Sequence, residues 1–353
     1  MNIVVVDTAA DSGGALSILR GLHSYALKDT RHKWIFLLGK PHVAESENIK
    51  VVLIPQAKNS KIGRIMFDLV DGKKYVRSNH ADIVINLQNL WVWGCGVPQI
   101  IYQDQPIPFQ RIKKFSFMKP EERKLAFYQH IYGIFTKVAT RKANGVVVQT
   151  QWMLDAVEHQ CGVAKERVCL LPPYVDLSAI EHKEKGVDYR YDTFFYPASG
   201  GLYKNHECIY KACDILRKKR MPFTMSVTLN EGPCDNVNYV GQQKYADVLM
   251  RMKKSTLVFP SYIETYGLPL AEACGLGSIV LAADTPFARE ILAEYDNAYF
   301  FEYDKPEQLA ELMENVITKR IVREECLLTP VSCEDNTWER LIAFSENIAI
   351  NLK

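Results

Sequence analysis

The sequence has little of what would assign it directly to a functional class. Its 353 residues carry 43 basic and 41 acidic side chains, and the formal net charge of +2 gives no overall field for nucleic acid. No apolar run approaches the roughly 18 residues of a membrane span, and the chain enters its first apolar run without a basic leader. We therefore expect a globular protein of the cytoplasm, with no transmembrane segment and no nucleic-acid partner.

Two familiar kinds of motif are also missing. The nine cysteines form no CxxC pair and no Cys/His spacing typical of zinc, and a chain of this length does not need disulfides, so we predict reduced thiols, mostly in the core. No GxGxxG fingerprint follows the first apolar run, and no acidic residue closes the second run, at residues 36–39. The missing fingerprint weakens the hypothesis that the protein is an NAD-dependent oxidoreductase, which stays as a third alternative.

What is present is an alternation of short apolar runs with helical patterns, which is typical of parallel sheets with right-handed crossovers. The length exceeds the roughly 250–300 residues at which one core stops growing, so we expect two domains. Strands are predicted in the first half at 3–6, 34–38, 51–54, 83–87, 100–102, 146–149 and 168–171. In the second half they are predicted at 193–197, 224–228, 238–240, 256–260, 279–282 and 298–301, with helices near 205–218, 243–253, 269–276 and 306–318.

The pattern predicts an α/β protein of two Rossmann-like parallel-sheet domains, residues 1–173 and 174–330, with a polar linker near 174–192. Residues 331–353 are expected to form a terminal helix that packs back toward the first domain.

Ligands of open α/β sheets bind at the carboxyl ends of the strands, so the loops that leave those ends are the places to search. The first such loop ends in Gly13 and Gly14, just before a helical pattern. Glycines let the backbone approach a ligand, and free N–H groups at a helix start suit an anion or a polar sugar. A tight turn that binds nothing explains the same pattern equally well.

A second glycine-rich loop follows the strand at 193–197. It places Lys204 at the entrance of a helix, with Asn205 as the expected N-cap. A lysine there would bring a positive charge to a phosphate that the helix start already attracts. A solvated surface lysine is the alternative.

The third loop, residues 261–273, is the most informative segment. Pro269 is expected as the first residue of a helix, which puts Glu264 on the loop at the sheet edge and Glu272 in the opening turn. Carboxylates accept paired hydrogen bonds from vicinal hydroxyls of a sugar or a ribose. Neighbouring backbone N–H groups suited to a diphosphate are those of Tyr266, Gly267 and Leu268. Taken singly, Glu272 could equally serve only to complement the helix dipole, and Glu264 could be an ordinary surface residue without a role.

In context, Glu264 and Glu272 resemble the E-x7-E signature of retaining family-4 glycosyltransferases. The resemblance extends over most of the chain, through Gly13-Gly14, residues 149–153, 171–176 and 239–241, and Arg289-Glu290. It implies the GT-B fold, in which two Rossmann-like domains face a central cleft. The first would bind the acceptor and the second the nucleotide-sugar donor.

The resemblance also implies roles for individual residues. Glu264 would contact hydroxyls of the donor sugar, Glu272 the nucleotide ribose, and Lys204 the diphosphate. The implied donor-binding set is Gly13, Gly14, Lys204, Glu264, Tyr266, Gly267, Leu268 and Glu272. No metal ion and no other cofactor is implied, which agrees with the lack of a DxD motif in the sequence.

The sequence departs from the family pattern at two positions. Members usually carry an arginine a few residues before the lysine, whereas the loop here runs through residues 200–203 without one. Many members carry a histidine where this chain has Asp104. That carboxylate would bind the donor sugar or orient the acceptor hydroxyl, or would only cap the turn before Pro106. With Glu264 and Lys204, it completes the predicted catalytic set.

Residues 110–144 concentrate positive charge, with nine basic and two acidic residues and aromatic residues between them. On a helix-like segment this composition suits an anionic membrane surface or a lipid-diphosphate acceptor. A solvated helix face whose aromatics enter the core is the alternative. The predicted membrane or acceptor patch consists of Arg111, Lys113, Lys114, Lys119, Arg123 and Lys124.

The resemblance thus implies a retaining, metal-independent hexosyltransferase at the cytoplasmic face of the membrane. Its donor would be a UDP-sugar, with GDP-mannose as the second choice. Its acceptor would be a glycan, lipid-linked, in the biosynthesis of cell-surface polysaccharide or lipopolysaccharide. Two alternatives of the same fold stay open, a sugar-nucleotide epimerase and a non-catalytic protein that binds sugar nucleotides or glycans.

Overall fold

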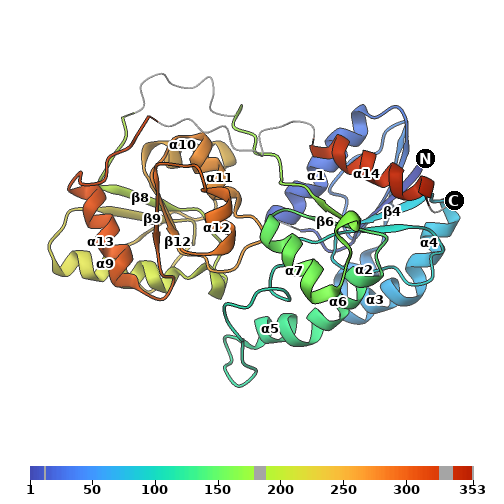
Figure 1. Ribbon diagram of the computed structural model, residues 1–353, viewed down its shortest axis with the longest axis horizontal. Coiled ribbons are helices and arrows are strands. Elements are labelled where there is room, and N and C mark those ends of the chain that lie inside the picture. The colour runs from blue at the N-terminus through green and yellow to red at the C-terminus, as the bar shows by residue number, and fades with distance from the viewer. Residues whose placement is uncertain (12, 179–187, 326–336, 352–353) are drawn as a thin grey trace. The chain divides into compact units, whose positions relative to one another are not determined.

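The computed structural model describes residues 1–11, 13–178, 188–325 and 337–351 (Figure 1). The chain divides into two compact units, Met1–Pro173 with Asp335–Lys353, and Tyr174–Glu334. Part of the predicted linker, residues 179–187, lies outside the described residues, as do Cys326 and Cys333. The seven cysteines within the described residues are free thiols, and five of them are buried.

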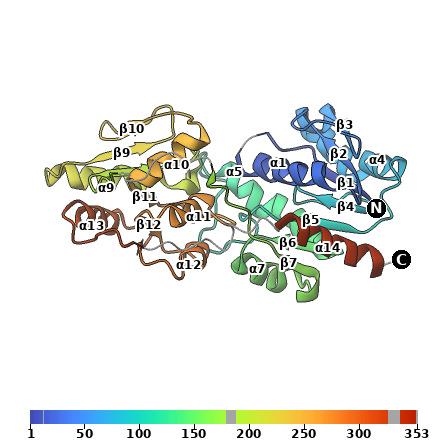
Figure 2. The same cartoon turned by 90° about the horizontal axis from the view of Figure 1, so that it is seen from above.

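The first unit contains a parallel sheet in the order β3-β2-β1-β4-β5-β6-β7, which Figure 2 shows strand by strand. Buried, β-branched runs form these strands because both faces of a parallel sheet are covered by helices. All seven predicted strands of this half are confirmed within two residues. Their bounds are β1 (Asn2–Asp7), β2 (Lys33–Leu38), β3 (Ile49–Leu53), β4 (Ile83–Asn86), β5 (Gln99–Tyr102), β6 (Gly145–Val148) and β7 (Val168–Leu170).

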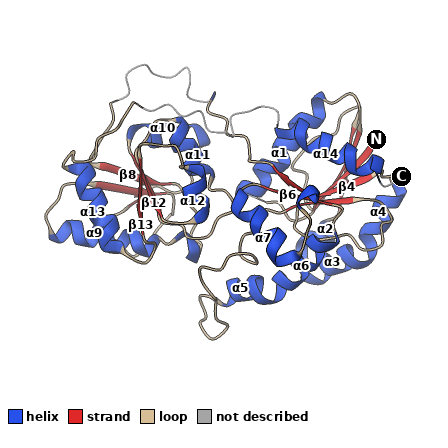
Figure 3. Cartoon of the chain, viewed as in Figure 1, coloured by secondary structure: helices blue, strands red, loops and turns tan. Residues whose placement is uncertain are grey.

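Helices cover both faces of this sheet (Figure 3). Two helical stretches contain a wider π-helical turn, namely η1 between α3 and α4 and η2 between α5 and α6. The first of these stretches is α2 (Pro55–Asn59), α3 (Lys61–Met66), η1 (Phe67–Asp71) and α4 (Gly72–Ser78). The second is α5 (Arg123–Ala126), η2 (Phe127–Tyr132) and α6 (Gly133–Lys142). The other helices are α1 (Gly13–Lys28), α7 (Gln151–Cys161), the 3₁₀ turn η3 (Lys165–Arg167) and α14 (Thr337–Asn351).

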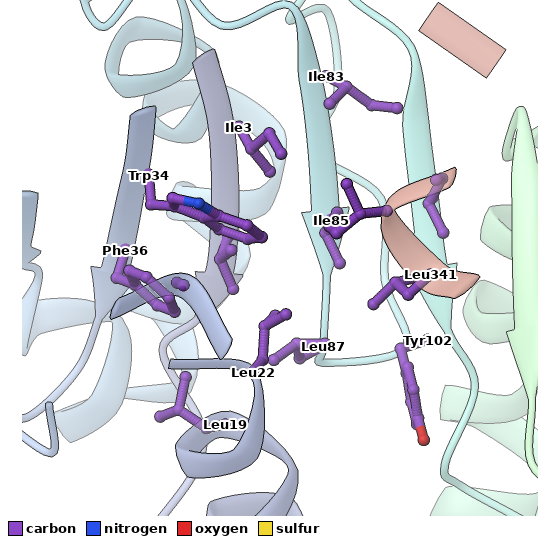
Figure 4. Close-up of a cluster of buried hydrophobic side chains, with 14 of the residues drawn as sticks. Ile3, Leu19, Leu22, Trp34, Phe36, Ile83, Ile85, Leu87, Tyr102 and Leu341 are labelled. Carbon is purple, nitrogen blue, oxygen red and sulfur yellow. The ribbon is translucent and has the colours of Figure 1, made fainter. Parts of the chain in front are cut away.

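The alternation of side chains along β1 divides the core of this unit in two. Ile3 and Val5 pack with Leu19 of α1 and Leu341 of α14 on one face, as Figure 4 shows for several of these residues. On the other face, Val4 and Val6 pack against η1 and α4. The terminal helix α14 is therefore part of the core of the first unit. Residues 331–336 of the predicted terminal segment lie outside the described residues.

The second unit repeats the arrangement with the order β10-β9-β8-β11-β12-β13. The six predicted strands of this half are confirmed within one residue and the four predicted helices within two. The strands are β8 (Thr193–Tyr196), β9 (Thr224–Val227), β10 (Asn238–Tyr239), β11 (Thr256–Phe259), β12 (Val280–Ala283) and β13 (Ala298–Phe301). The helices are η4 (Leu202–Lys204), α9 (His206–Lys218), α10 (Tyr245–Lys254), α11 (Leu268–Gly275), α12 (Pro286–Ile291) and α13 (Pro306–Ile317). Within residues 188–325, only α12 and the short 3₁₀ turn η4 had no counterpart in the prediction.

These two sheets confirm the predicted α/β fold class of two Rossmann-like parallel-sheet units. In each sheet the strand order reverses at one place, between β1 and β4 in the first unit and between β8 and β11 in the second. Crevices at such switch points are where open α/β sheets bind ligands. No helix among the described residues has the length and apolar character to span a membrane.

Candidate functional site

At the switch point of the second unit, Lys204 and Glu264 form an ion pair. The strands β8 and β11 are parallel neighbours, so the loops that follow them leave the sheet at the same edge. Lys204 Nζ lies 2.5 Å from Glu264 Oε1, and both side chains are mostly buried. Ser261 Oγ donates a hydrogen bond to the same carboxylate oxygen at 2.6 Å. The topology thus brings together two residues that lie 60 positions apart in the sequence.

The two loops also hold each other through their backbones. The carbonyl of Tyr203 accepts hydrogen bonds from the amide of Tyr262 at 3.1 Å and from Ser261 Oγ at 3.2 Å. The buried Tyr196 hydroxyl, at the end of β8, donates to the carbonyl of Lys204 at 3.0 Å. This cross-bracing fixes the position of the Lys204–Glu264 pair.

The ion pair decides the charge state of the lysine. Burial alone lowers the pKa of Lys204, but the charge of Glu264 and its hydrogen bond together raise this pKa above its ordinary value. Lys204 is therefore protonated at neutral pH. Its ammonium group is held by the carboxylate rather than free in solvent, so the alternative of a solvated surface lysine is wrong.

Asn205 stands at the start of α9 as predicted, but it does not cap the helix with its side chain. Its backbone is left-handed, with φ of 59°. Its Nδ2 donates to the carbonyls of Pro260 at 3.2 Å and Tyr303 at 2.7 Å. The amide group of Asn205 therefore ties the β8 loop to the β11 loop, because bonds to those two carbonyls replace the expected capping bond.

Glu272 is buried on α11 and has a different partner. Its Oε1 accepts a hydrogen bond of 2.9 Å from the Tyr245 hydroxyl of α10. Burial raises the pKa of Glu272 to about 7, although the bond from Tyr245 lowers it in part. The sequence predicted that Glu272 lies in the opening turn of its helix. This prediction is wrong, because α11 begins at Leu268 and Glu272 is its fifth residue. Its exposure of 6% shows that it does not merely complement the helix dipole at the surface.

The start of α11 is shaped by Gly267. This glycine has φ of +91°, in the left-handed region that favours glycine, and it directly precedes the helix. Leu268 rather than Pro269 is the first helical residue, which corrects the prediction by one position. The side chain of Tyr266 packs with Val175 and Ala271 in an apolar cluster. The predicted contact of its backbone amide with a ligand stays a prediction.

In the first unit, the loop after β1 leads through Gly13 and Gly14 into α1. Gly13 has φ of +64°, and a Cβ at either glycine would meet no atom within 4 Å. The space in front of both glycines is therefore open. Nearby, Asp11 pairs with Lys40 at 2.7 Å and with Lys58 at 3.6 Å.

A cluster of acidic and amide side chains occupies the switch point between β1 and β4. Asn89, with φ of 61°, donates from Nδ2 to Asp104 Oδ1 at 2.6 Å, and its Oδ1 accepts from Gln103 Nε2 at 2.7 Å. Gln88 accepts from Thr8 at 3.0 Å. Asp104 therefore accepts a hydrogen bond from an amide side chain of the loop after β4. The alternative in which Asp104 only caps the turn before Pro106 does not account for this bond.

In this cluster Asp7 is buried and Asp104 is partly buried, and neither forms an ion pair with a lysine among the described residues. Burial raises the pKa of Asp104 to about 6. Burial, with a smaller contribution from the charge of Asp104, also raises the pKa of Asp7 to about 6. Asp7 Oδ1 accepts from the amide of Ala10 at 3.0 Å, while the buried Oδ2 has no hydrogen-bond partner among the described residues.

Both π-helical turns contribute a polar side chain near this cluster. Asp68 of η1 accepts from Gln88 Nε2 at 3.3 Å and from Arg64 Nε at 3.2 Å. Tyr132 of η2 donates to the carbonyl of Gln88 at 3.4 Å. π-helical turns within α-helices often mark functional positions. Here both lie next to the switch point of the first unit.

The predicted basic patch does not lie on one helix. Arg111, Lys113, Lys114 and Lys119 are in a loop, and only Arg123 and Lys124 are helical, in α5. Lys113 pairs with the buried Glu122 at 3.0 Å, and Lys119 lies 3.6 Å from the same carboxylate. The expectation of a helix-like segment holds only from residue 123 onward. The preceding stretch contains Pro120 and is held as a loop by Glu122, which accepts from the amide of Ser116 at 2.9 Å and pairs with the two lysines. The role of the patch stays a prediction.

Several residues of these two clusters were not predicted. Asp7 is the last residue of β1, and Gln88 and Asn89 lie two and three residues beyond the end of β4. Polar residues at these strand ends were therefore a signal that could have found them. Tyr245 and Tyr132 lie within helices and gave no such signal. Among the described residues, no group of three or more His, Cys, Asp or Glu side chains could hold a metal ion.

Comparison with known proteins supports one class of enzyme. Residues 178–327 match the family model of glycosyl transferases group 1, which supports a glycosyltransferase of the GT-B type. No curated protein matches the chain in sequence.

Solved structures share the fold over almost the whole chain. WaaG, a glycosyltransferase involved in lipopolysaccharide biosynthesis, is 13% identical with a TM-score of 0.67, over 100% of this chain and 98% of WaaG. Anabaena HepE in complex with UDP-glucose is 15% identical with a TM-score of 0.64, over 100% and 99%. A putative UDP-N-acetylglucosamine 2-epimerase from Listeria monocytogenes is 10% identical with a TM-score of 0.63, over 97% and 95%. At these identities the likeness establishes the GT-B fold, and the reaction has to be argued from the site.

Proposed function

We propose that this protein is a retaining, metal-independent glycosyltransferase of the family-4 type, in which Glu264 and Glu272 form the E-x7-E pair. The observation that carries the proposal is the buried Lys204–Glu264 pair at the switch point of the second unit. The match of residues 178–327 to group 1 glycosyl transferases supports it. The preferred donor is a UDP-sugar, supported by the likeness to HepE with UDP-glucose, and GDP-mannose is the alternative.

The donor's diphosphate would lie between Lys204 and the start of α11. Lys204 is protonated, so it can offset the charge that develops on the leaving phosphate. The backbone N–H groups of Gly267 and Leu268 stand at the start of α11 and would donate to the same phosphate. Preorganised charges and donors of this kind supply much of many enzymes' rate enhancement. They would take the place of a metal ion and of the arginine that family members usually carry.

The two glutamates would bind opposite ends of the donor. Glu264 already accepts bonds from Lys204 and Ser261, which fixes its carboxylate as an acceptor for the sugar hydroxyls. Glu272, whose pKa is about 7, would be held in its charged form by bonds from the ribose hydroxyls. The Gly13–Gly14 loop of the first unit would contact the donor phosphates or the acceptor.

The acceptor hydroxyl would bind at the carboxyl cluster of the first unit, where Asp104 orients it. During transfer the bond between the anomeric carbon and the phosphate oxygen breaks, and the acceptor oxygen forms a bond on the same face of the sugar. The hydroxyl proton passes to the leaving phosphate oxygen. Retention then needs no carboxylate nucleophile, which suits a Glu264 that is engaged by Lys204 and Ser261.

We propose a lipid-linked glycan as the acceptor and the cytoplasmic face of the membrane as the place of reaction. The basic loop at residues 111–119 supports an acceptor that carries phosphate, because lysine and arginine bind phosphate through charge-assisted hydrogen bonds. A role in cell-surface polysaccharide or lipopolysaccharide biosynthesis follows from that acceptor. The fold that the chain shares with WaaG is compatible with it.

Calorimetric titration with EDTA present tests the donor site. UDP or GDP should bind wild-type protein, and Glu272→Gln should weaken binding about tenfold, the order of one charged hydrogen bond. Glu311→Gln, on the exposed face of α13, is the matched control and should change nothing. Slow release of the α-anomer from UDP-glucose, followed by NMR in EDTA, would show a retaining transfer to water. Binding of neither nucleotide would overturn the proposal.

The likeness to a putative 2-epimerase keeps a second reaction in view. An epimerase would convert UDP-N-acetylglucosamine into its 2-epimer without any acceptor, which the same NMR measurement detects. A protein that only binds sugar nucleotides would show nucleotide affinity but neither release nor epimerisation. Calorimetry together with NMR on both sugar nucleotides therefore distinguishes the three outcomes.

A further inference from the structure

The helical stretch α5–η2–α6 exposes large apolar side chains that no described residue covers. Ile134 and Phe135 are each 63% exposed, far more than apolar side chains that face a core. They recur at helical spacing with their neighbours, so they form a stripe along one side of the helix. The stripe consists of Phe127, Ile131, Ile134, Phe135 and Val138.

The stretch α3–η1 carries a second such group, Ile65, Met66, Leu69 and Val70. Trp93, itself exposed, connects the two stretches. Its backbone N–H donates to the carbonyl of Asp68 in η1 at 2.9 Å, and its ring lies 4.0 Å from Lys142 Nζ at the end of α6. Tyr132 of η2 is also close enough to Arg64 and Asp68 for their charges to act on its hydroxyl. The two stretches are therefore neighbours, and we call their exposed apolar side chains together the apolar face.

Positive charge borders the apolar face. Exposed Arg123 and Lys124 stand at the start of the stripe, and exposed Arg141 and Lys142 at its end. The loop that precedes α5 adds Met118, which is 86% exposed, beside basic residues of the predicted patch. Residues 110–144 carry nine basic and two acidic side chains, although the net charge of the whole chain is only +2. The cations are thus concentrated where the apolar side chains are exposed.

This combination fits one partner better than others. Contiguous exposed apolar patches are unfavourable in water and mark interaction surfaces. A helix that lies in a membrane interface has bulky apolar residues on one face and lysine or arginine at its borders. A second copy of the chain would bring the same excess of positive charge to both sides of the contact, which opposes self-association.

We propose that the apolar face of the first unit docks on an anionic membrane, with Phe127, Ile131, Ile134, Phe135 and Val138 inserted at the level of the headgroups. The docking does not depend on sugar transfer. One consequence rests on the proposed function: Asp68 and Tyr132 of the same helical stretches contact Gln88 at the switch point of the first unit. A lipid-linked acceptor would therefore have its sugar end close to Asp104 while its lipid stays in the membrane.

Flotation of the purified protein with vesicles tests the docking. Binding should be strong to phosphatidylcholine vesicles that contain phosphatidylglycerol, weak to phosphatidylcholine alone, and reduced by salt. The double variant Ile134→Ser/Phe135→Ser should lower the partition coefficient about tenfold or more, because it removes apolar area from the inserted stripe. The matched control is Leu27→Ser/Leu53→Ser, two exposed apolar residues of the same unit away from the face, and it should bind as wild type does.

A charge variant keeps the proposal testable even if the serine variant folds poorly. Arg123→Gln/Lys124→Gln should lower binding to the anionic vesicles about fivefold per charge, whereas Lys28→Gln/Lys33→Gln should not. A urea titration checks that each variant is folded. Equal binding of wild type and Ile134→Ser/Phe135→Ser, or no preference for anionic vesicles, would overturn the proposal. So would a dimer in solution that Ile134→Ser/Phe135→Ser dissociates, since the face would then be a contact between copies.

Discussion

The two units place different chemistry at the same topological position. Each sheet reverses its strand order next to its first strand, and each reversal holds carboxyl groups that are buried or partly buried. In the second unit, Glu264 is paired with Lys204. In the first unit, Asp104 is bonded to the amide of Asn89, and Asp7 to a backbone N–H. The first-unit cluster also contains a cation, Arg64, but it pairs with Asp68. The difference therefore lies in the carboxyl groups of Asp104 and Asp7, whose pKa values burial raises, against a Glu264 that is held by a lysine.

This difference shows how one fold can serve two substrates. A protonated lysine beside a helix start suits a ligand with negative charge, such as a nucleotide diphosphate. A carboxyl group without a cation suits a neutral hydroxyl that can donate to it, such as that of an acceptor sugar. The topology fixes where a ligand binds, and the side chains at that place determine its charge.

The largest effect is expected from removing the cation of the second unit. Lys204→Met should lower the rate of sugar transfer or donor hydrolysis by roughly 10²–10³-fold, the usual cost of losing one group that stabilises the leaving charge. Steady-state release of UDP from UDP-glucose measures it. Lys211→Met, which removes an exposed lysine of α9 paired with Glu207, should leave the rate unchanged. Equal rates for both variants would remove Lys204 from the mechanism.

The buried carboxyl group of Asp7 in the first unit should be evident in the pH dependence of stability. The pKa of Asp7 is about 6, above its ordinary value of 3.8. Between about pH 4 and pH 6 the unfolded chain releases this proton first, so the free energy of unfolding falls as pH rises. Above pH 6 the loss stays constant. Asp7→Asn should remove this loss and stabilise the protein by about 3 kcal/mol at pH 8, with little gain at pH 4.

Urea unfolding at both pH values measures this effect. Asp71→Asn is the control, since Asp71 is exposed and paired with Lys74. An Asp7→Asn variant that is less stable than wild type at pH 8 would mean that the charged carboxylate has a stabilising partner, and the contrast between the units would fail.

Glu272 should make nucleotide binding depend on pH. Its pKa is about 7 in the free protein, and the ribose would bind the charged form. The affinity for UDP should therefore rise about tenfold between pH 6 and pH 8 relative to Glu272→Gln, which cannot titrate. Tyr245→Phe removes the bond that lowers this pKa, so its profile should shift to higher pH. Parallel profiles for wild type and Glu272→Gln in calorimetry would contradict the ribose contact.

The smallest effects should come from the two glycines that precede α1 and α11. Alanine at Gly13 meets no neighbouring atom, so only the left-handed backbone opposes it, at about 1 kcal/mol. Alanine at Gly267 faces the same backbone restriction and also meets Leu270 Cδ1 at 3.3 Å. Gly267→Ala should therefore lower the free energy of unfolding more, and should also weaken UDP binding. A larger loss for Gly13→Ala would show that the first loop is the more constrained one.

The strands could be predicted because buried parallel strands are short, uniformly apolar runs between polar residues. The π-helical turns could not be predicted from the sequence, because no residue pattern marks a helix that widens by one residue. Lys204 and Glu264 were each singled out, and only the adjacency of β8 and β11 shows that they form a pair. The bond between Tyr245 and Glu272 joins two helices, so no local spacing encodes it.

Hydrogen–deuterium exchange with and without UDP tests most directly whether the second switch point is the donor site. UDP should slow exchange in the two loops at residues 198–205 and 260–268, and should leave residues 86–105 of the first unit unchanged. Lys204→Met should weaken the protection of both loops together. Protection confined to residues 86–105, with none at either loop of the second unit, would contradict the assignment of the donor to Lys204 and Glu264.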